Sequence, residues 1–362
     1  MRLDMLEMWL RSPKASRRRK AIQKLRKEAL RNVSLIDKYF DQFIELVNDE
    51  DWAVRAASLH SCIEFSKVKK NLTSRVLPVI KEKVKDPSPN VRAIALRGLS
   101  ELLTEDMLEA FIYDAYTRAI KDENNDVRIA ALELAKKIAK YDADFFVKHV
   151  EEFLNTLNSD AVGPIKEKIL EIFADNIDKL DEKMLHALKD AIFKNIKHRD
   201  FAVRVACLRT LSKMYELGKI DENELRTILR KRLRDEAIPV KIAAIELIEK
   251  IIDKNARFAD NYLDIISKEI LRKEKNLRLK LRTLEMLDKT VDKIPTEIVN
   301  KHELPRTLDI LDKLTVEKRE ELRKIKMLAR HILEEKLGFT FEKRRKLWGS
   351  KEIRKTRKFG SK

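Results

Sequence analysis

Glycine and proline are scarce in this sequence. Its 362 residues include only 6 Gly and 8 Pro, which is about a third of the roughly 12% that these two residues make up in an average protein. Turns that require a positive φ are correspondingly few. The shortage excludes most β-rich folds.

Long uncharged segments are also missing. Charged residues interrupt every stretch before it reaches the roughly 18 apolar residues of a membrane span. Asp4 and Glu7 lie where a secretory signal would have its apolar core, so we expect a soluble, intracellular protein, most simply a cytoplasmic one. The two cysteines, Cys62 and Cys207, are too few for a disulfide framework or a zinc site and are expected to be buried thiols.

Charge is distributed unevenly along the chain. Residues 1–31 contain 11 basic and 3 acidic residues, and residues 339–362 contain 10 and 2. Each end therefore carries a net +8, which leaves only +2 of the total +18 for the rest. Two basic ends favour an anionic partner such as nucleic acid, an acidic protein or a phospholipid surface.

A motif recurs seven times between these ends. It is anchored on aliphatic residues that lie 36 to 39 positions apart, namely Val54, Val91, Val127, Ile165, Val203, Val240 and Leu279. Apolar residues recur five and eight positions after each anchor, as on one face of a helix. A second amphipathic segment precedes each anchor, so each copy is predicted to be a helix, a short turn and a second helix.

Two charged positions accompany the anchors. The next residue is always basic: Arg55, Arg92, Arg128, Lys166, Arg204, Lys241 and Lys280. Five residues before the anchor six copies have an acid, namely Asp49, Asp86, Asp122, Asp160, Asp235 and Glu274, and His198 takes its place in the seventh. We expect the acid to cap the second helix and to pair with the base of the next copy. This hypothesis predicts a ladder that holds the hairpins in register.

The recurring pattern resembles the HEAT-repeat family, in which an Asp in the turn is followed six residues later by the base of a Val-Arg or Val-Lys pair. The match covers roughly residues 12 to 292. The resemblance implies an all-α, right-handed α-solenoid whose second helices line its concave side. It also implies a scaffold for proteins or nucleic acids.

The two ends of the chain depart from the motif. Arg17 replaces the anchor of an incomplete first copy, as in a capping repeat with a polar outer face. After Asp292 the motif fails, and helices are expected over 303–313 and 316–336. We therefore predict about seven to eight hairpins in four parts: a basic N-terminal capping repeat (1–31), the solenoid (32–292), C-terminal capping helices (293–338) and a basic flexible tail (339–362).

Basic residues at both ends are the candidate nucleic-acid contacts. Cations release counterions from phosphates and aromatic rings stack on bases. The candidates are Arg17, Arg18, Arg19, Lys20, Lys343, Arg344, Arg345, Lys346, Trp348, Arg354, Lys355, Arg357 and Lys358. The alternatives are a solvated capping helix at the N-terminal end and, at the other end, a solubilising tail or a tail that binds protein.

Signs of catalysis are weak. The six histidines are scattered, none of them placed at i, i+4, as a helical metal site would require. Phosphate-binding and nucleophile motifs are absent. His302-Glu303 is the sole His-Glu pair, whereas the HEAT-type deoxyhypusine hydroxylases repeat that pair. We expect no enzyme activity, no metal and no cofactor.

Three functions from different classes remain. The first is a scaffold that binds a protein partner on its concave face and nucleic acid or a ribonucleoprotein through its basic ends. The second is a pure protein adaptor whose tails contact acidic partners. The third is a HEAT-like DNA glycosylase, which is disfavoured because Trp9, Trp52 and Trp348 do not form a groove within the repeats. A monomer is expected, and the Lys, Ile and Glu bias is typical of a thermophile.

Overall fold

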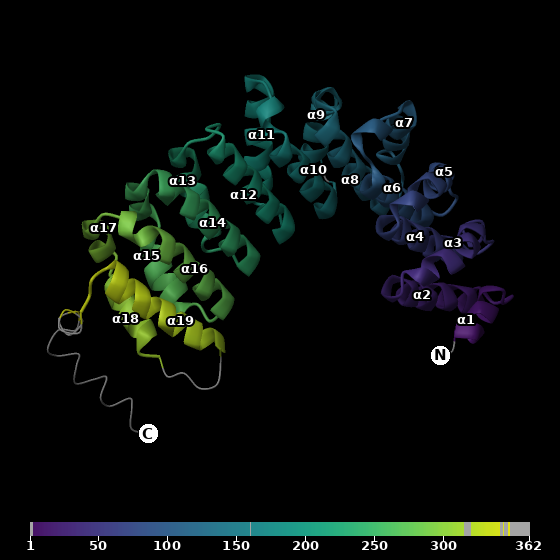
Figure 1. Cartoon of the computed structure of the whole chain (residues 1–362). Helices are drawn as coiled ribbons and strands as arrows, with labels where there is room; N and C mark the ends of the chain where they lie inside the picture. The colour runs from purple at the N-terminus through teal and green to yellow at the C-terminus, as the bar shows by residue number, and fades with distance from the viewer. Residues whose placement is uncertain (1–2, 160, 315–319, 341–342, 344–346, 348–362) are drawn as a thin grey trace. The chain divides into compact units, whose positions relative to one another are not determined.

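A computed structural model describes residues 3–159, 161–314, 320–340, 343 and 347. These residues form helices and turns, with no β-strand among them. Consecutive helices pack as hairpins (Figure 1). The predicted all-α architecture of repeated helical hairpins is confirmed.

The chain divides into two compact units, Met1–Met184 and Leu185–Lys362. The first unit begins with a pair of helices, α1 and α2, which is followed by four hairpins. Its helices are α1 (Leu3–Leu10), α2 (Ala15–Arg31), α3 (Ser34–Leu46), α4 (Trp52–Val68), α5 (Thr73–Lys83), α6 (Pro89–Leu102), α7 (Ala110–Ala119), α8 (Asn125–Tyr141), α9 (Ala143–Asn158) and α10 (Gly163–Asp175).

The second unit continues the same alternation of first and second helices. It contains most of α11 (Glu182–Asn195), followed by α12 (Phe201–Glu216), α13 (Glu222–Arg232), α14 (Ile238–Lys254), α15 (Leu263–Ile265), α16 (Leu277–Thr290), α17 (Thr296–Lys301), α18 (Leu304–Asp312) and α19 (Glu320–His331). The short α15 continues into a π-helical segment over Ile266–Lys273. No helix in these described stretches is long and apolar enough to cross a membrane.

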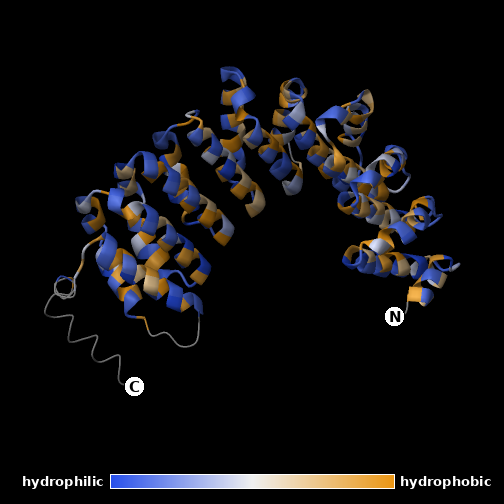
Figure 2. Cartoon of the chain, in the orientation of Figure 1, coloured by the Kyte–Doolittle hydropathy of each residue, from blue (hydrophilic) through white to orange (hydrophobic). Residues whose placement is uncertain are grey.

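Helix α8 shows why the recurring segments fold as they do. The Asn124 side chain accepts hydrogen bonds from the backbone N–H groups of Asp126 and Val127 and so caps the helix. Apolar residues then recur at helical spacing and are buried, Val127 and Leu134 among them. The opposite face is polar, and the same alternation of hydrophobic and hydrophilic residues marks the other helices (Figure 2). Burial of this apolar face provides the driving force for stacking.

Second helices form the core of each unit. In the first unit α2, α4, α6, α8 and α10 each contact the next, and in the second unit the same holds for α12, α14, α16 and α19 (Figure 1). Helix α19 therefore packs on α16 as a further second helix, although the charged motif ends before it. Ile325 and Ala329 of its apolar stripe are fully buried.

Predicted helices near the C-terminal end lie close to the observed ones. The helix expected over 303–313 is α18, and the one expected over 316–336 is described from Glu320 and extends through Lys336. Residues 315–319 lie outside the described part of the chain. Helix α17 was not predicted. The four-part division of the chain stays a prediction.

Candidate interaction surfaces

A row of ion pairs joins successive hairpins at the start of their second helices. Arg55 donates through Nε and Nη2 to the two carboxylate oxygens of Asp86, both at 2.8 Å. Arg92 donates in the same bidentate way to Asp122, at 2.8 and 3.0 Å. Equivalent pairs link Arg18 with Asp49, Arg204 with Asp235, and Lys241 with Glu274.

The direction of this pairing corrects the prediction. We expected the acid of one copy to meet the base of the next, but the base of one copy reaches forward to the acid of the following copy. Arg55 shows the reason, because its Nη1 also donates to the backbone oxygens of Asp49 and Glu50 in its own turn. The guanidinium is thereby fixed beside its own turn, with its remaining N–H groups directed at the next repeat.

The capping role of the acid also needs correction. Asp49 accepts a hydrogen bond from the backbone N–H of Asp51 at 2.9 Å, so its carboxylate braces the turn. The N-cap of α4 is Asp51 itself, which accepts from Ala53 and Val54. The acid lies three residues before the first helical residue, too far back to reach the free N–H groups of the helix, and therefore closes a local turn instead.

Three basic positions of the motif have other surroundings. Arg128 donates to the backbone oxygens of Asp122 and Glu123, at 2.6 and 3.2 Å. Asp160, its predicted counterpart in register, lies outside the described residues. Lys166 donates to the backbone oxygen of Leu157 at 2.8 Å. Lys280 is half-buried, and this burial lowers its pKa against the opposing effect of Glu274.

These ion pairs shift the pKa values of two of their members towards the charged form. Burial alone would raise the pKa of the Asp122 carboxyl, but hydrogen bonds from Arg92 and from the Asn124 backbone N–H hold it below its ordinary value. The hydrogen bond to Asp86 raises the pKa of Arg55. The Asp122 carboxyl and the Arg55 guanidinium are therefore charged over the whole neutral range.

A second row of ion pairs, which sequence reasoning missed, crosses the second helices. In the first unit the pairs are Arg26–Glu64 at 2.6 Å, Lys67–Glu101 at 2.9 Å, Arg97–Glu133 at 3.2 Å and Lys136–Glu171 at 3.3 Å. Their members are 34 to 38 residues apart, close to one repeat. This one-repeat separation of opposite charges is the sequence signal that could have predicted the second row of ion pairs. The pairs neutralise cations that would otherwise add to a basic surface.

The predicted N-terminal site separates into a buried and an exposed part. Arg18 is 7% exposed and bonds to Asp49 and to the Ser12 backbone oxygen. It belongs to the ladder and is unavailable to a ligand, which corrects its assignment as a nucleic-acid contact. Arg17 and Lys20 are exposed and lie 5.8 and 5.7 Å from the centre of the Trp9 ring.

The exposed cations of α2 form a stripe. They follow the spacing of three and four residues that places side chains on one helix face, and comprise Arg17, Lys20, Lys24, Lys27 and Arg31. Arg31 pairs with Glu28 at 3.4 Å. Within the described chain the other four have no ion-pair partner. Arg19 is exposed as well, beside the stripe.

Little of the predicted C-terminal site can be placed. Lys343 is exposed and donates to the backbone oxygen of Gly338 at 3.1 Å. The remaining candidates lie outside the described residues: Arg344, Arg345, Lys346, Trp348, Arg354, Lys355, Arg357 and Lys358. Their role stays a prediction.

Metal-ligating clusters and reactive thiols are two kinds of site that could support chemistry in the described part of the molecule. It contains no cluster of three His, Cys, Asp or Glu side chains that could hold a metal ion. Cys62 and Cys207 are both fully buried, and burial raises the pKa of the Cys62 thiol. A thiol of raised pKa is a poor nucleophile.

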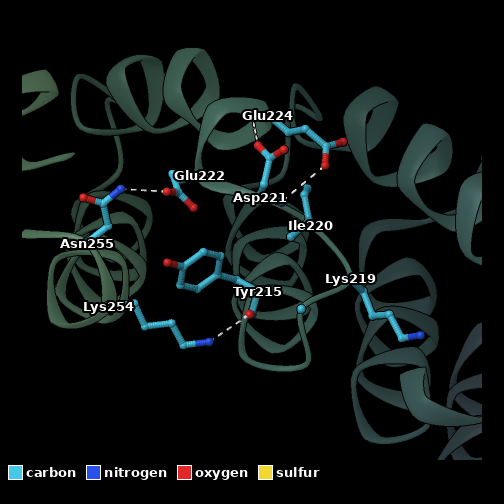
Figure 3. A pocket seen from close by; sticks show the side chains of 9 residues that line it. Tyr215, Lys219, Ile220, Asp221, Glu222, Glu224, Lys254 and Asn255 are labelled. Atoms are coloured by element: carbon cyan, nitrogen blue, oxygen red, sulfur yellow. Dashed lines mark hydrogen bonds between the residues drawn. The ribbon is translucent and has the colours of Figure 1, made fainter. Parts of the chain in front are cut away.

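A polar hollow of about 610 Å³ lies where α12 ends, α13 begins and α14 ends (Figure 3). Asn255 donates to Glu222 at 2.8 Å, and Lys254 donates to the Tyr215 backbone oxygen at 3.3 Å. The Lys254 ammonium also lies 4.8 Å from the centre of the Tyr215 ring. Asp221 caps α13. These side chains form hydrogen bonds with one another and with the backbone. They therefore stabilise the turn between α12 and α13.

A more apolar hollow of about 310 Å³ lies between α11 and α13. Phe193, Ile196 and Ile228 supply most of its apolar lining, and Lys197 and Lys231 lie among its polar neighbours. Ile196 is buried, whereas Phe193 and Ile228 are partly exposed. This hollow therefore offers space for an apolar group.

The hairpin stack and its buried ladder define a HEAT/armadillo-type α-solenoid. Within that class, the family model of the sister chromatid cohesion protein PDS5 matches residues 3–216. The match covers more than half of the sequence, and the chain belongs to the PDS5 family. No protein with a curated description matches it.

Solved structures of importin-beta share the fold. Yeast importin-beta (Kap95p) and the Kap95:Nup1 complex each superpose with a TM-score of 0.65 at 15% identity, covering 91% of this chain and 45% of theirs. Importin-beta in an ammonium sulfate condition gives a TM-score of 0.58 at 12% identity, with the same coverage. This chain thus spans less than half the length of these proteins, and the likeness concerns the fold alone.

Proposed function

We propose that this protein is a non-enzymatic scaffold that binds a protein partner in sister chromatid cohesion. The observation that carries the proposal is the PDS5 match across the repeats of residues 3–216. Stacked hairpins offer extended surfaces of the kind on which repeat proteins bind other chains. The proposed place of action is the chromosome, as the PDS5 match favours, and it replaces the cytoplasmic location that the sequence alone led us to expect.

Affinity capture tests the scaffold proposal. The full chain carrying a C-terminal tag is expressed in its own cells, cross-linked and purified after nuclease treatment, and its cross-linked partners are identified by mass spectrometry. We expect chromosomal cohesion proteins, with cross-links on the second helices. Nuclease-resistant capture of unrelated proteins only, or of none, would refute this function.

A second function is supported by the stripe on α2. Its cations are exposed, whereas those on the second helices α4, α6 and α8 are paired with acids of the next helix. Arg17 to Arg31 spans 14 residues, or about 21 Å of helix. Such an array of cations favours a phosphate backbone, because nucleic-acid interfaces are more polar and more positive than protein interfaces. We infer nucleic acid as the anionic partner.

Charge reversal tests this second function. Lys20→Glu, Lys24→Glu and Lys27→Glu are combined, and binding to a 30-base-pair duplex is followed by fluorescence anisotropy over a range of salt. Loss of three phosphate contacts should lower the dependence of log K on log salt by about three. The control combines Lys70→Glu, Lys85→Glu and Lys121→Glu, which change the same charge at exposed turns of the same unit. If both triple variants changed duplex affinity and its salt dependence equally, the stripe would not be the nucleic-acid site.

The C-terminal tail is proposed to add to the same function. Removal of residues 339–362 takes away a net charge of +8. If duplex affinity and its salt dependence survive this truncation, the tail has been assigned wrongly. If they fall while the α2 variant stays active, the tail alone carries the function.

A further inference from the structure

The apolar hollow between α11 and α13 is a groove between two first helices. Phe193, Ile196 and Lys197 are spaced as one face of α11 and its C-terminal end, and Glu224, Ile228 and Lys231 are spaced as one face of α13. The two faces line the hollow from opposite sides. The groove is therefore built by rigid helices, which position a binding site more accurately than loops do.

Three other junctions between first helices are covered by a cation of one helix that lies over an aromatic ring of the neighbouring helix or turn. The contacts are Arg75 over Phe40 at 4.9 Å, Lys81 over Phe111 at 5.3 Å and Arg226 over Phe258 at 5.3 Å. Within the described residues no cation covers Phe193. The Phe193 ring borders an open space, whereas at these three junctions a cation covers the ring.

The two ends of the groove differ in charge. At one end Lys189 pairs with Glu224 at 3.2 Å and joins α11 to α13. At the other end Lys197 and Lys231 are exposed, with no ion pair to any described residue. Arg232 is held by Asp235 at 2.8 Å. Free positive charge is thus concentrated at one end of an apolar space.

We propose that this groove binds a short acidic segment of a partner protein, with one bulky apolar side chain inserted between α11 and α13. The apolar side chain packs on Phe193, Ile196 and Ile228, and the neighbouring carboxylates face Lys197 and Lys231. A volume of about 310 Å³ is at the lower limit for ligand pockets and suits one anchoring side chain. The proposal rests on the scaffold function and names the kind of partner segment.

Peptide binding to the full chain tests the groove. The probe is a fluorescein-labelled hexapeptide, Glu-Glu-Asp-Phe-Glu-Glu, followed by anisotropy. Two matched peptides replace its Phe with Ala or all its acids with Lys. We expect the Phe peptide to bind at least tenfold more tightly than either, with an affinity that falls as salt rises. Equal binding of the Phe and Ala peptides would overturn the proposal.

Variants locate the binding site. Thr227→Trp fills the groove from an exposed position and should abolish binding, whereas Asn223→Trp, exposed on the same helix, should leave it unchanged. Lys197→Glu with Lys231→Glu should weaken binding at least fivefold, and Lys219→Glu should not. If Thr227→Trp binds as the unaltered chain does, the groove is not the site. A groove-dependent preference for a single-stranded oligonucleotide over the peptide would also contradict a protein partner.

This result is separable from the scaffold test. If cohesion proteins are captured equally by the unaltered chain and by Thr227→Trp, and this variant binds the peptide as the unaltered chain does, the scaffold function stands and the groove proposal is wrong. A peptide that binds the groove while no cohesion protein is captured would give the opposite outcome. The scaffold proposal and the groove proposal can therefore be refuted independently.

Discussion

At the scale of single residues, the ladder explains why a basic side chain recurs on the first turn of each second helix. A cation there is unfavourable, because the helix N-terminus carries a partial positive charge. Arg55 overcomes this cost with hydrogen bonds to two backbone oxygens of its own turn and to the carboxylate of Asp86. Arg92 and Arg204 repeat the arrangement, so one residue type joins a turn to the next repeat.

Replacement of Arg55 by Leu should destabilise the chain by about 3 kcal/mol. The substitution leaves Asp86, which is 6% exposed, buried without its bidentate partner, and broken buried pairs cost roughly 3–5 kcal/mol. Urea unfolding measures the loss. Lys67→Leu is the control, since it removes the exposed pair with Glu101 and should cost less than about 1 kcal/mol. Similar losses for the two variants would show that the ladder is no stronger than surface pairs.

The Asp122 carboxyl makes the ladder sensitive to acid. Its folded-state pKa lies below the ordinary value, so it contributes stability above about pH 4 and loses this contribution as the pH falls through the folded-state pKa. Asp122→Asn should therefore be less stable than the unaltered chain at pH 7, with a difference that narrows below about pH 4. Thermal unfolding between pH 2.5 and 7 tests this. Glu123→Gln controls for the change of charge at an exposed site, and a gap independent of pH would contradict the assignment.

At the scale of helices, the period of the motif predicted the fold. The anchors Val54 to Leu279 lie on second helices that pack on one another within each unit, because a fixed spacing of apolar residues fixes which face each helix buries. Helix α19 continues the stack without the charged motif. Burial of apolar side chains is sufficient for stacking there, and the Asp and Arg positions of the motif give no signal for this further second helix.

The candidate sites were less predictable than the helices. Arg18 and Arg19 are neighbours in a basic run, yet the first is buried and the second exposed. Helical phase relative to the ladder makes this difference, and it could have been read from the equivalence of Arg18 with Arg55. The α11–α13 groove had no such signal. It depends on the absence of a cation over Phe193, and therefore on the rotamers and spacing of two helices distant in sequence.

Gly98 allows the second helices α4 and α6 to pack closely. A Cβ atom at this position of α6 would lie 2.3 Å from Cδ1 and 2.9 Å from Cγ1 of Ile63 on α4. Gly98→Ala should therefore destabilise by about 1–3 kcal/mol through overpacking, although Ala is the better helix former by about 1 kcal/mol. Urea unfolding of a double-mutant cycle with Ile63→Ala tests the contact, because the Ala at 98 should become favourable once Ile63 is shortened. A stabilising Gly98→Ala on its own would show that Ile63 rotates away freely.

At the scale of the whole molecule, charge is balanced in the repeats and unbalanced at the ends. The 307 residues between 32 and 338 carry a net charge of about +2, and many of their exposed cations pair with acids of the neighbouring repeat. These pairs serve stacking. The free cations of α2, by contrast, are available to a partner, so position in the stack and not composition alone separates structural from binding charge.

Local packing also determines how far a destabilising substitution affects the stability of other repeats. Each hairpin contacts mainly its neighbours, so stability should be a sum of hairpin and nearest-neighbour contributions. Arg55→Leu should then lower hydrogen-exchange protection in α4 and α6 by at least tenfold while α14 and α16, in the other unit, keep theirs. Exchange measured by mass spectrometry at low denaturant distinguishes the cases. A uniform loss of protection from α2 to α19 would mean that the repeats unfold as one cooperative body, and the ladder would then act on the whole chain at once.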